Sequence, residues 1–188
     1  MPHQKSKKII LYLFLFLVIG SLNNKNINDN DFSKISKIVI SGLDQETNLN
    51  LLNSLEIFKN QNIFFLSKRN IKKIIDANNF VENYSIFKKY PNSLEIKITK
   101  AKLLAHVNKN GKNYLLGSNG KLIKTNDLTN NMPFIYGDFI NKEFFKLKKI
   151  IDKSKFNYKN IKNLYYFPSG RWDIEFYSGV LIKLPKNR

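Results

Sequence analysis

The chain has 188 residues, of which 43% are hydrophobic, so it can bury a core in one large or two small domains. It has no cysteine, which excludes disulfides, thiolate metal sites and cysteine nucleophiles. Its formal charge of +18 suggests nucleic acid or anionic lipid as a partner. However, only three of its 32 basic residues are arginine, and the lysines are scattered along the chain. This distribution indicates that the charge reflects amino-acid composition and not nucleic-acid binding.

The first segment has the pattern of a membrane or export signal. Residues 1–8 contain Lys5, Lys7 and Lys8 and no acid, and the apolar run 9–22 follows without a charge. Basic residues before an apolar run favour an N-terminus that stays in the cytoplasm. The run is short against the roughly 20 apolar residues of a spanning helix, so a cleaved signal peptide is the alternative. In both cases the rest of the chain is exported.

A polar linker, residues 23–33, leads into a predicted α+β unit, residues 34–102. Its first strand ends at Gly42. We expect Thr47 to cap one helix and Ser67 to cap a second, because apolar residues then recur at helical spacing.

The segment 86–98 predicts a β-hairpin that completes this unit. Its two strands alternate apolar and polar residues on either side of the turn Tyr90-Pro91-Asn92-Ser93. Pro91 suits the turn, where it has no ladder hydrogen bond to lose. The predicted order is strand, helix, helix, strand, strand, with both helices on one face of the sheet.

Residues 103–188 predict a β-rich domain of antiparallel strands with one helix. Asn110-Gly111, Asn119-Gly120 and Ser178-Gly179 are expected hairpin turns. The helix is expected at 141–154, which is amphipathic. Residues 180–184 are expected to pair with 172–177 across the last of these turns.

No residue pattern in the chain indicates catalysis, a cofactor or a metal. His106 stands without other sequence-close ligands, and we expect it to face solvent from a strand. The carboxylates are spread out, without a recognisable catalytic pair. Five aromatic residues lie in apolar contexts that favour a core position, namely Phe64, Phe65, Phe87, Trp172 and Phe176.

Several segments then occur in a characteristic order after the apolar run: ISKIVISG, NIFFLSKRNIKKII, FVENYSIFKKYPNSLEIKI, NYLLGSNGKLI, MPFIYGD and RWDIEFYSGVLIKL. This order resembles the bacterial cell-division family FtsQ, also called DivIB. The most specific stretch contains an apolar pair, a strand residue, two lysines, an aromatic residue and a proline, here Phe80-Val81, Ile86, Lys88-Lys89, Tyr90 and Pro91.

The resemblance implies a single N-terminal transmembrane helix, a POTRA domain at 34–102 and the family's β domain at 103–188. It implies a non-enzymatic scaffold in the cell inner membrane at the division septum, with the N-terminus cytoplasmic and the other domains periplasmic. The implied partners are the divisome proteins FtsB and FtsL and also FtsK, with no nucleic acid, small-molecule substrate or cofactor.

The resemblance also indicates candidate partner-binding residues. In the POTRA sheet these are Asn83, Ile86 and Lys88, and in the β domain they are Gly170, Arg171, Val180 and Ile182. The family continues past the strand that matches 180–184, and its last strand is implicated in docking FtsB. The chain therefore resembles either a fragment or a form shortened at its C-terminus, and FtsB docking is the interaction that the missing strand affects most.

Two other functions remain as alternatives at this point. One is a POTRA-containing component of outer-membrane assembly or secretion, which a large transmembrane barrel would identify. The other is a secreted basic protein that binds nucleic acid or an anionic polymer, which a clustered face of arginine and aromatic residues would identify.

Overall fold

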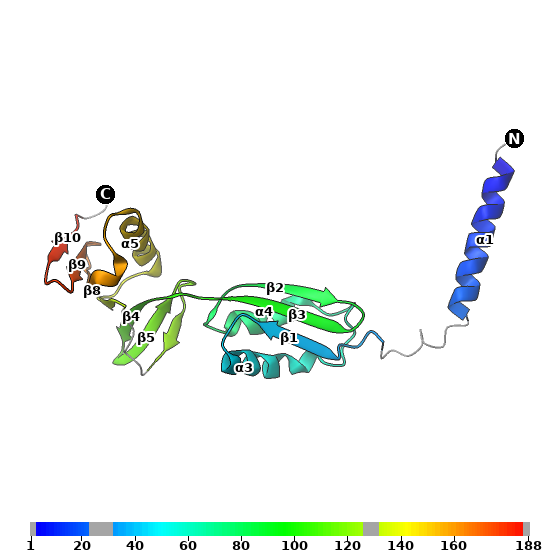
Figure 1. The fold of residues 1–188 in the computed structure, drawn as a ribbon, viewed down its shortest axis with the longest axis horizontal. Coiled ribbons are helices and arrows are strands. Elements are labelled where there is room, and N and C mark those ends of the chain that lie inside the picture. The colour runs from blue at the N-terminus through cyan, green and yellow to red at the C-terminus, as the bar shows by residue number, and fades with distance from the viewer. Residues whose placement is uncertain (1–2, 23–31, 126–131, 186–188) are drawn as a thin grey trace. The chain divides into compact units, whose positions relative to one another are not determined.

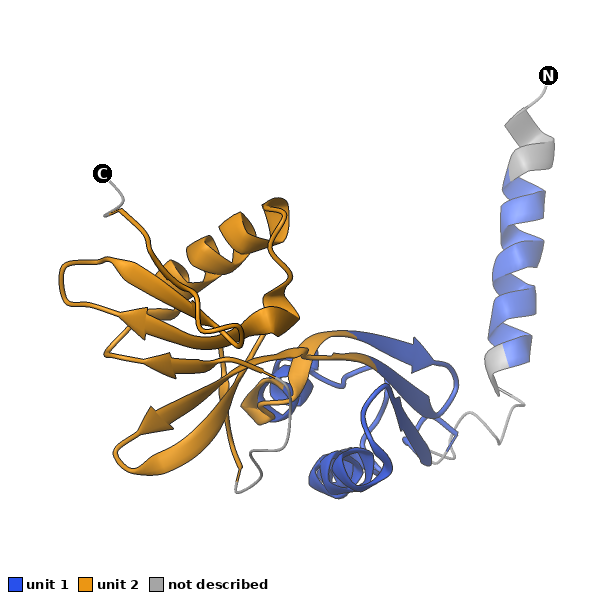
Figure 2. Cartoon of the chain, turned by 60° about the vertical axis from the view of Figure 1, so that its left-hand side comes forward, with its two compact units in different colours: residues 1–75, 85–97 blue, residues 76–84, 98–188 orange. Residues whose placement is uncertain are grey.

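The computed structural model of the chain describes residues 3–22, 32–125 and 132–185 (Figure 1). Its contacts divide the chain into two compact units (Figure 2). Unit 1 comprises residues 1–75 and 85–97, and unit 2 comprises residues 76–84 and 98–188. The short segment 76–84 therefore belongs to unit 2, although it lies within the segment 34–102 that the sequence groups together.

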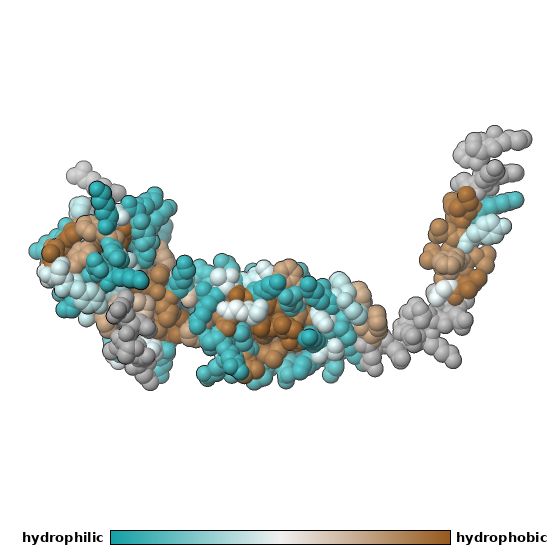
Figure 3. All heavy atoms as spheres, viewed as in Figure 1, coloured by the Kyte–Doolittle hydropathy of each residue, from teal (hydrophilic) through white to brown (hydrophobic). Residues whose placement is uncertain are grey.

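The N-terminal helix α1, His3–Leu22, begins before the predicted apolar segment 9–22. Every side chain from Ile9 to Leu17 is 47–78% exposed. Nine consecutive residues go more than twice round an α-helix, so this surface encircles α1, and Figure 3 shows much of its visible face in brown. Among the described residues, no helix combines the length with the apolar composition that a membrane crossing requires.

The sheet of unit 1 has three strands in the order β1-β3-β2. Strand β3 lies in the centre and pairs in parallel with β1, with Ile38 opposite Leu94 and Ile40 opposite Ile96. The predicted order of strand, helix, helix, strand, strand is confirmed. The elements are β1 Lys37–Ser41, α3 Gln45–Leu55, η1 Glu56–Phe58, α4 Lys68–Ala77, β2 Val81–Lys89 and β3 Ser93–Lys100.

The first helix of this unit begins earlier than predicted. Asp44, not Thr47, is the N-cap of α3, and its carboxylate accepts hydrogen bonds from the Thr47 backbone N–H at 3.1 Å and the Thr47 hydroxyl at 2.5 Å. A carboxylate at this position satisfies a free N–H group and interacts well with the helix dipole. The second helix begins directly after Ser67, as expected.

Unit 2 contains a sheet of seven strands in the order β10-β9-β8-β7-β4-β5-β6. Most pairs are antiparallel, as predicted, but β7 runs parallel to both of its neighbours, so the purely antiparallel prediction is wrong there. The elements are β4 Leu103–Lys109, β5 Lys112–Gly117, β6 Leu122–Lys124, β7 Phe134–Tyr136, α5 Asn141–Lys153, η2 Tyr158–Asn160, β8 Ile161–Tyr166, β9 Trp172–Phe176 and β10 Leu181–Lys183.

Helix α5 covers one face of this sheet and makes the core of the unit. Its buried residues Phe144, Leu147 and Ile151 belong to the same apolar cluster as Trp172 and Ile174. The predicted helix at 141–154 is thus confirmed to within one residue. Strand register places a continuous apolar row on this face, formed by Ile182, Ile174, Leu164, Ile135 and Val107.

Two predictions about individual side chains are wrong. His106 does not face solvent: it is 1% exposed, and its ring stacks on Phe134 with centroids 4.7 Å apart. Of the five aromatic residues assigned to a core, Trp172 and Phe176 are buried. The other three are exposed on unit 1: Phe64 by 59%, Phe65 by 87% and Phe87 by 44%.

Candidate partner-binding edges

The most distinctive chemical feature of the chain is its open sheet edges. Among the described residues, no group of three or more His, Asp or Glu side chains could hold a metal ion. Each sheet instead ends in strands that have a neighbour on one side only, namely β1 and β2 in unit 1 and β10 and β6 in unit 2. An edge strand presents free N–H and C=O groups with which another chain can pair.

Strand β10 pairs with β9 in antiparallel orientation. Leu181 lies opposite Glu175, and Ile182 lies opposite Ile174. The Phe176 N–H donates to the Val180 carbonyl and the Leu184 N–H donates to the Trp172 carbonyl, each at 3.0 Å. The predicted pairing of 180–184 with 172–177 is confirmed.

These two bonds also define which backbone groups of β10 point outward. In an antiparallel pair, hydrogen-bonded positions alternate with positions whose N–H and C=O face the other side. Since Val180 and Leu184 bond to β9, Leu181 and Lys183 face the open edge. No described residue pairs with their outward groups, and Leu181 is 49% exposed.

The backbone groups of the predicted contact residues Val180 and Ile182 point toward β9, and the role of these residues in partner contact stays a prediction. Ile182 packs against the core on the α5 face, and Val180 is 54% exposed beside the turn that joins β9 to β10. The sequence predicts unpaired main-chain groups along 180–184, and the register narrows them to those of Leu181 and Lys183. Strict alternation from the turn at Ser178-Gly179 would have identified them.

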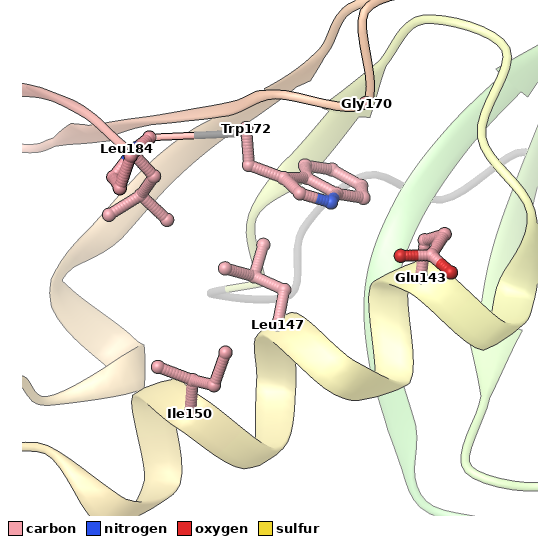
Figure 4. A pocket seen from close by; sticks show the side chains of 7 residues that line it. Glu143, Leu147, Ile150, Gly170, Trp172 and Leu184 are labelled. Atoms are coloured by element: carbon pink, nitrogen blue, oxygen red, sulfur yellow. The ribbon is translucent and has the colours of Figure 1, made fainter. Parts of the chain in front are cut away.

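A pocket of about 190 Å³ lies beside the end of β10, between α5 and the sheet (Figure 4). Leu147 and Ile150 point into it from α5, and Trp172 and Leu184 face them from the sheet side. Gly170 and Pro185 complete this mostly apolar wall, and Glu143 is its one charged residue. The pocket can take an apolar side chain next to the open edge.

Gly170 and Arg171 lie in the tight turn between β8 and β9. Gly170 has φ +82°, a conformation that favours glycine, and its N–H donates to the Phe167 carbonyl at 2.8 Å. The Arg171 guanidinium lies 4.6 Å from the Phe167 ring centre and 3.0 Å from the buried carboxylate of Asp173. Two intramolecular partners therefore hold Arg171 beside the pocket.

The sheet face opposite α5 carries a polar cluster next to β10. The Tyr165 hydroxyl donates to Glu175 at 2.6 Å, and the Asn163 amide donates to the same oxygen at 2.9 Å. The bond from Tyr165, followed by the bond from Asn163, holds the pKa of Glu175 below its usual value. Glu175 is therefore a carboxylate at neutral pH, directly opposite Leu181 in the register.

The other three predicted contact residues lie on β2, an edge strand of the three-stranded sheet. Asn83 is exposed, whereas Ile86 and Lys88 are half-buried, and alternation places Asn83 on the opposite sheet face from the other two. The Lys88 ammonium donates to the Phe64 carbonyl at 3.3 Å. These three residues therefore share one strand and do not form a single side-chain surface.

Strand β6 is an edge of a different kind, because neighbouring side chains occupy it. The Asn79 amide donates to the Leu122 carbonyl at 2.8 Å. The Asn119 amide donates to the carbonyls of Asn79 at 2.9 Å and Val81 at 2.8 Å, and the Lys121 ammonium donates to the carbonyl of Asp76 at 2.5 Å. The turn before β6 thus fixes the segment 76–84 within unit 2.

Two sequence profiles match the chain. One is described as the POTRA domain, FtsQ-type, and matches residues 33–100; the other is described as cell division protein FtsQ/DivIB, C-terminal, and matches residues 105–188. Together they cover most of the chain.

Individual relatives carry the same description. The chain is 28% identical over 115 residues to cell division protein DivIB of Clostridium tetani, covering 61% of this chain and 43% of that protein. It is 27% identical over 162 residues to DivIB of Staphylococcus aureus strain NCTC 8325, covering 84% and 33%. The chain thus spans less than half the length of these curated relatives.

Among solved structures, the chain matches the major extracytoplasmic domain of the trans isomer of DivIB from Geobacillus stearothermophilus. The sequence identity is 14% and the TM-score is 0.36, with 46% of this chain and 79% of that chain covered.

Proposed function

Because the chain belongs to the FtsQ/DivIB family of cell-division proteins, we propose that it is a non-enzymatic scaffold of septum formation that binds other division proteins through the open edge of its seven-stranded sheet. One observation carries the proposal: the outward backbone groups of Leu181 and Lys183 have no partner among the described residues.

The binding step would be the addition of a strand. A partner segment in extended conformation forms main-chain hydrogen bonds with Leu181 and Lys183, and these bonds supply affinity without reading a sequence. Specificity comes from side chains, and the pocket between Leu147 and Trp172 offers a place for one apolar side chain. The partner class is the exported segment of a FtsB-type protein, together with the FtsL-type protein associated with it.

A second contact surface in the same scaffold is strand β2, with Asn83, Ile86 and Lys88. Its nine residues make it the longer of the two edges in its sheet. A strand of that length can pair with an extended segment of a further division protein, such as FtsK. Lys88→Glu would weaken septal localisation of a stably folded chain, and unchanged localisation of that variant would remove β2 from the proposal.

We also propose that α1 holds the chain at the cell inner membrane, with its N-terminus in the cytoplasm and the two units outside it. The exposed apolar surface from Ile9 to Leu17 supports this, because a helix that is apolar on all sides is unfavourable in water. Lys7 and Lys8 precede that surface and favour a cytoplasmic N-terminus. A soluble mature chain that begins near Ser21 would contradict the anchor.

The strand-addition step can be tested with a backbone substitution. Lys183→Pro removes an outward N–H while the bonds from β10 to β9 stay in place, because proline is tolerated where a strand N–H faces away from the ladder. The matched control is Lys183→Ala, which removes the side chain and keeps the N–H. We expect roughly tenfold weaker binding of the exported FtsB segment by Lys183→Pro, and little change for Lys183→Ala.

Two readouts make this test decisive. Circular dichroism of both variants shows whether the sheet is intact, and titration calorimetry with the FtsB segment measures binding. Equal affinity of Lys183→Pro and Lys183→Ala, in chains that remain folded, would mean that the outward groups of β10 do not bind that partner.

A further inference from the structure

Four exposed aromatic residues of unit 1 have no role in the proposed scaffold. Phe65 is 87% exposed, Phe32 69%, Phe64 59% and Tyr90 58%. We name these four residues the aromatic cluster. Large apolar side chains at such exposure are unfavourable in water, and several together on one part of a domain indicate a binding surface.

Hydrogen bonds bring three separate parts of the sequence together at this cluster. The segment after Phe32 runs beside the loop before Phe64, because the Ile63 N–H donates to the Ser33 carbonyl and the Ile35 N–H donates to the Gln61 carbonyl, each at 2.9 Å. The Phe64 ring stacks on Tyr90 with centroids 5.0 Å apart.

The backbone around the cluster is held in place, so the exposure of the rings is built into the fold. The Phe64 N–H donates to the Asn62 side-chain oxygen at 2.9 Å, and the Phe64 carbonyl accepts from Lys88. The hairpin turn that follows Tyr90 bonds to the beginning of β1, where the Ser36 N–H donates to the Asn92 carbonyl at 2.9 Å. The cluster therefore lies at the end of the sheet where β1 begins.

Basic residues surround these rings. Lys68 and Arg69 follow Phe65 closely and are exposed, and Lys88 and Lys89 directly precede Tyr90. The segments 32–37, 61–75 and 85–93 contain no carboxylate, and the acids that precede Phe32 in the sequence are Asp29 and Asp31. Among these basic residues, Lys89 forms an ion pair with Glu95 on β3, with 3.4 Å between the ammonium nitrogen and a carboxylate oxygen, which offsets one positive charge. Aromatic rings are favoured at the headgroup level of a membrane, and nearby lysines are attracted to anionic lipids.

We propose that the aromatic cluster rests on an anionic lipid surface, with its rings at the level of the headgroups and the neighbouring lysines against lipid phosphates. The proposal relies on the anchoring of α1 put forward above. Residues 23–31 separate Leu22 of that helix from Phe32. A chain of that length spans at most about 35 Å, so an anchored α1 holds Phe32 within that distance of the membrane.

The short linker 23–31 between α1 and Phe32 is the reason to propose lipid, and not a protein, as the partner of the aromatic cluster. A surface that covalent linkage keeps near a bilayer meets lipid at a high effective concentration, so weak contacts suffice to hold it there. The remaining part of unit 1 does not share this placement. The first turn of α3 follows the far end of β1, and that strand of five residues separates it from the cluster by about 15 Å.

The absence of cysteine from the chain gives a clean experiment. Single variants of the full chain, Phe65→Cys, Glu46→Cys and Phe14→Cys, each carry an environment-sensitive fluorophore. They are reconstituted in vesicles of phosphatidylglycerol and phosphatidylcholine in equal parts, or of phosphatidylcholine alone, with a lipid-borne quencher. Glu46 is the matched control, since it is exposed in the first turn of α3, in the same unit.

In the anionic vesicles we expect a blue-shifted emission at position 65 and quenching roughly twofold or more above that at position 46. In phosphatidylcholine vesicles this difference shrinks, because a zwitterionic lipid surface has no net negative charge to attract the lysines. Adding Phe64→Ser and Tyr90→Ser to the labelled Phe65→Cys chain lowers its quenching to the level of the control. Both substitutions are at exposed positions, so the fold remains intact.

The label at position 14 separates the two proposals. Quenching at position 14 together with equal signals at positions 65 and 46 would overturn the lipid contact and leave the anchor intact. No quenching at position 14 would overturn the anchor and, with it, this inference. A signal at position 65 that appears only after another division protein is added would replace the lipid surface with a protein partner.

Discussion

The two outer strands of the seven-stranded sheet have the same sequence and different surroundings. Strands β6 and β10 both consist of Leu-Ile-Lys, as Leu122–Lys124 and Leu181–Lys183. In both strands the backbone N–H and C=O groups of the isoleucine point toward the neighbouring strand, and those of the leucine and the lysine point outward. The hydrogen bonds of the flanking residues define this pattern. Yet Ile123 is 6% exposed, whereas Ile182 is only half-buried and Leu181 is 49% exposed.

The difference teaches that strand residues alone do not decide whether an edge can bind. At β6, the Asn79 side-chain amide donates a hydrogen bond to the outward-facing carbonyl of Leu122. At β10, none of the described residues does the same for Leu181. An edge that the chain's own side chains occupy is blocked to a partner strand, so the proposed strand addition would be confined to the β10 end of the sheet.

The largest expected effect comes from the isoleucines of the two strands. Ile123→Ala should cost about 2–4 kcal/mol of unfolding free energy, because it leaves a cavity in a buried site, whereas the half-buried Ile182→Ala should cost about half as much. Urea unfolding measures both, followed by the fluorescence of Trp172, the chain's one tryptophan and a core residue of unit 2. Equal losses of unfolding free energy in the two variants would contradict the difference between β6 and β10, since they would mean that both isoleucines are equally buried.

The next effect concerns the β10 end alone. Arg171→Ala removes the cation beside Asp173, whose carboxylate is 3% exposed, so we expect a loss of about 2 kcal/mol from an unpaired buried charge. Arg171→Lys keeps the charge but not the planar group over Phe167, and should lose roughly half of that. The exposed Lys162, 3.7 Å from Glu175, is the control, since Lys162→Ala should change stability by less than about 0.5 kcal/mol.

A smaller effect is expected at the β6 end. Asn119→Ala removes the hydrogen bonds to Asn79 and Val81 and should cost about 1–2 kcal/mol. Asn113→Ala is the control: the half-buried Asn113 side chain accepts a hydrogen bond from the exposed Asn108 amide at 2.9 Å, and its loss should cost less than about 0.5 kcal/mol. Hydrogen exchange of segment 76–84 would show faster opening in Asn119→Ala. Unchanged protection there would mean that the turn does not hold this segment.

The smallest effect is a dependence on pH. Hydrogen bonds from Tyr165 and Asn163 lower the pKa of Glu175, so its contribution to stability is present above its ordinary pKa of 4.5 and is lost as the pH falls through the lowered value. Glu175→Gln should therefore be less stable than the parent chain at pH 7 and converge with it as the pH falls below the lowered pKa of Glu175. Thermal unfolding across that range measures the difference. A constant difference at every pH would exclude the charge of Glu175 as its cause.

Local patterns were sufficient where neighbours in the sequence are also neighbours in space. The glycine turn at Ser178-Gly179 fixes the pairing of β9 with β10, and amphipathic spacing identifies α5, because both depend on residues a few positions apart. The same rules failed for Phe64 and Phe65, since an apolar run looks alike in a core and on a surface. Their exposure depends on segments around residues 33 and 90, which no local pattern reports.

The candidate site shows the same limit. The sequence predicts an open edge along 180–184 but not which of its backbone groups face outward, because the direction of those at Leu181 and Lys183 depends on the strand register. Strand β7 has only three residues, too few for alternation to reveal it, and its parallel pairing depends on the strands on both sides. His106 is buried for the same reason, because its ring stacks on Phe134 of that strand.

The parallel position of β7 has a consequence for how unit 2 folds. Strands β4, β5 and β6 follow one another through tight turns, as do β8, β9 and β10, so each set of three can form early from local contacts. Strand β7 joins these sets, and its partners are distant in sequence: Phe134 pairs with His106 on one side and Asn163 on the other. Loop closure must precede these contacts, so insertion of β7 should be the slow step. Until then each set exposes a second edge, which makes the newly synthesised chain most prone to misassembly before β7 is in place.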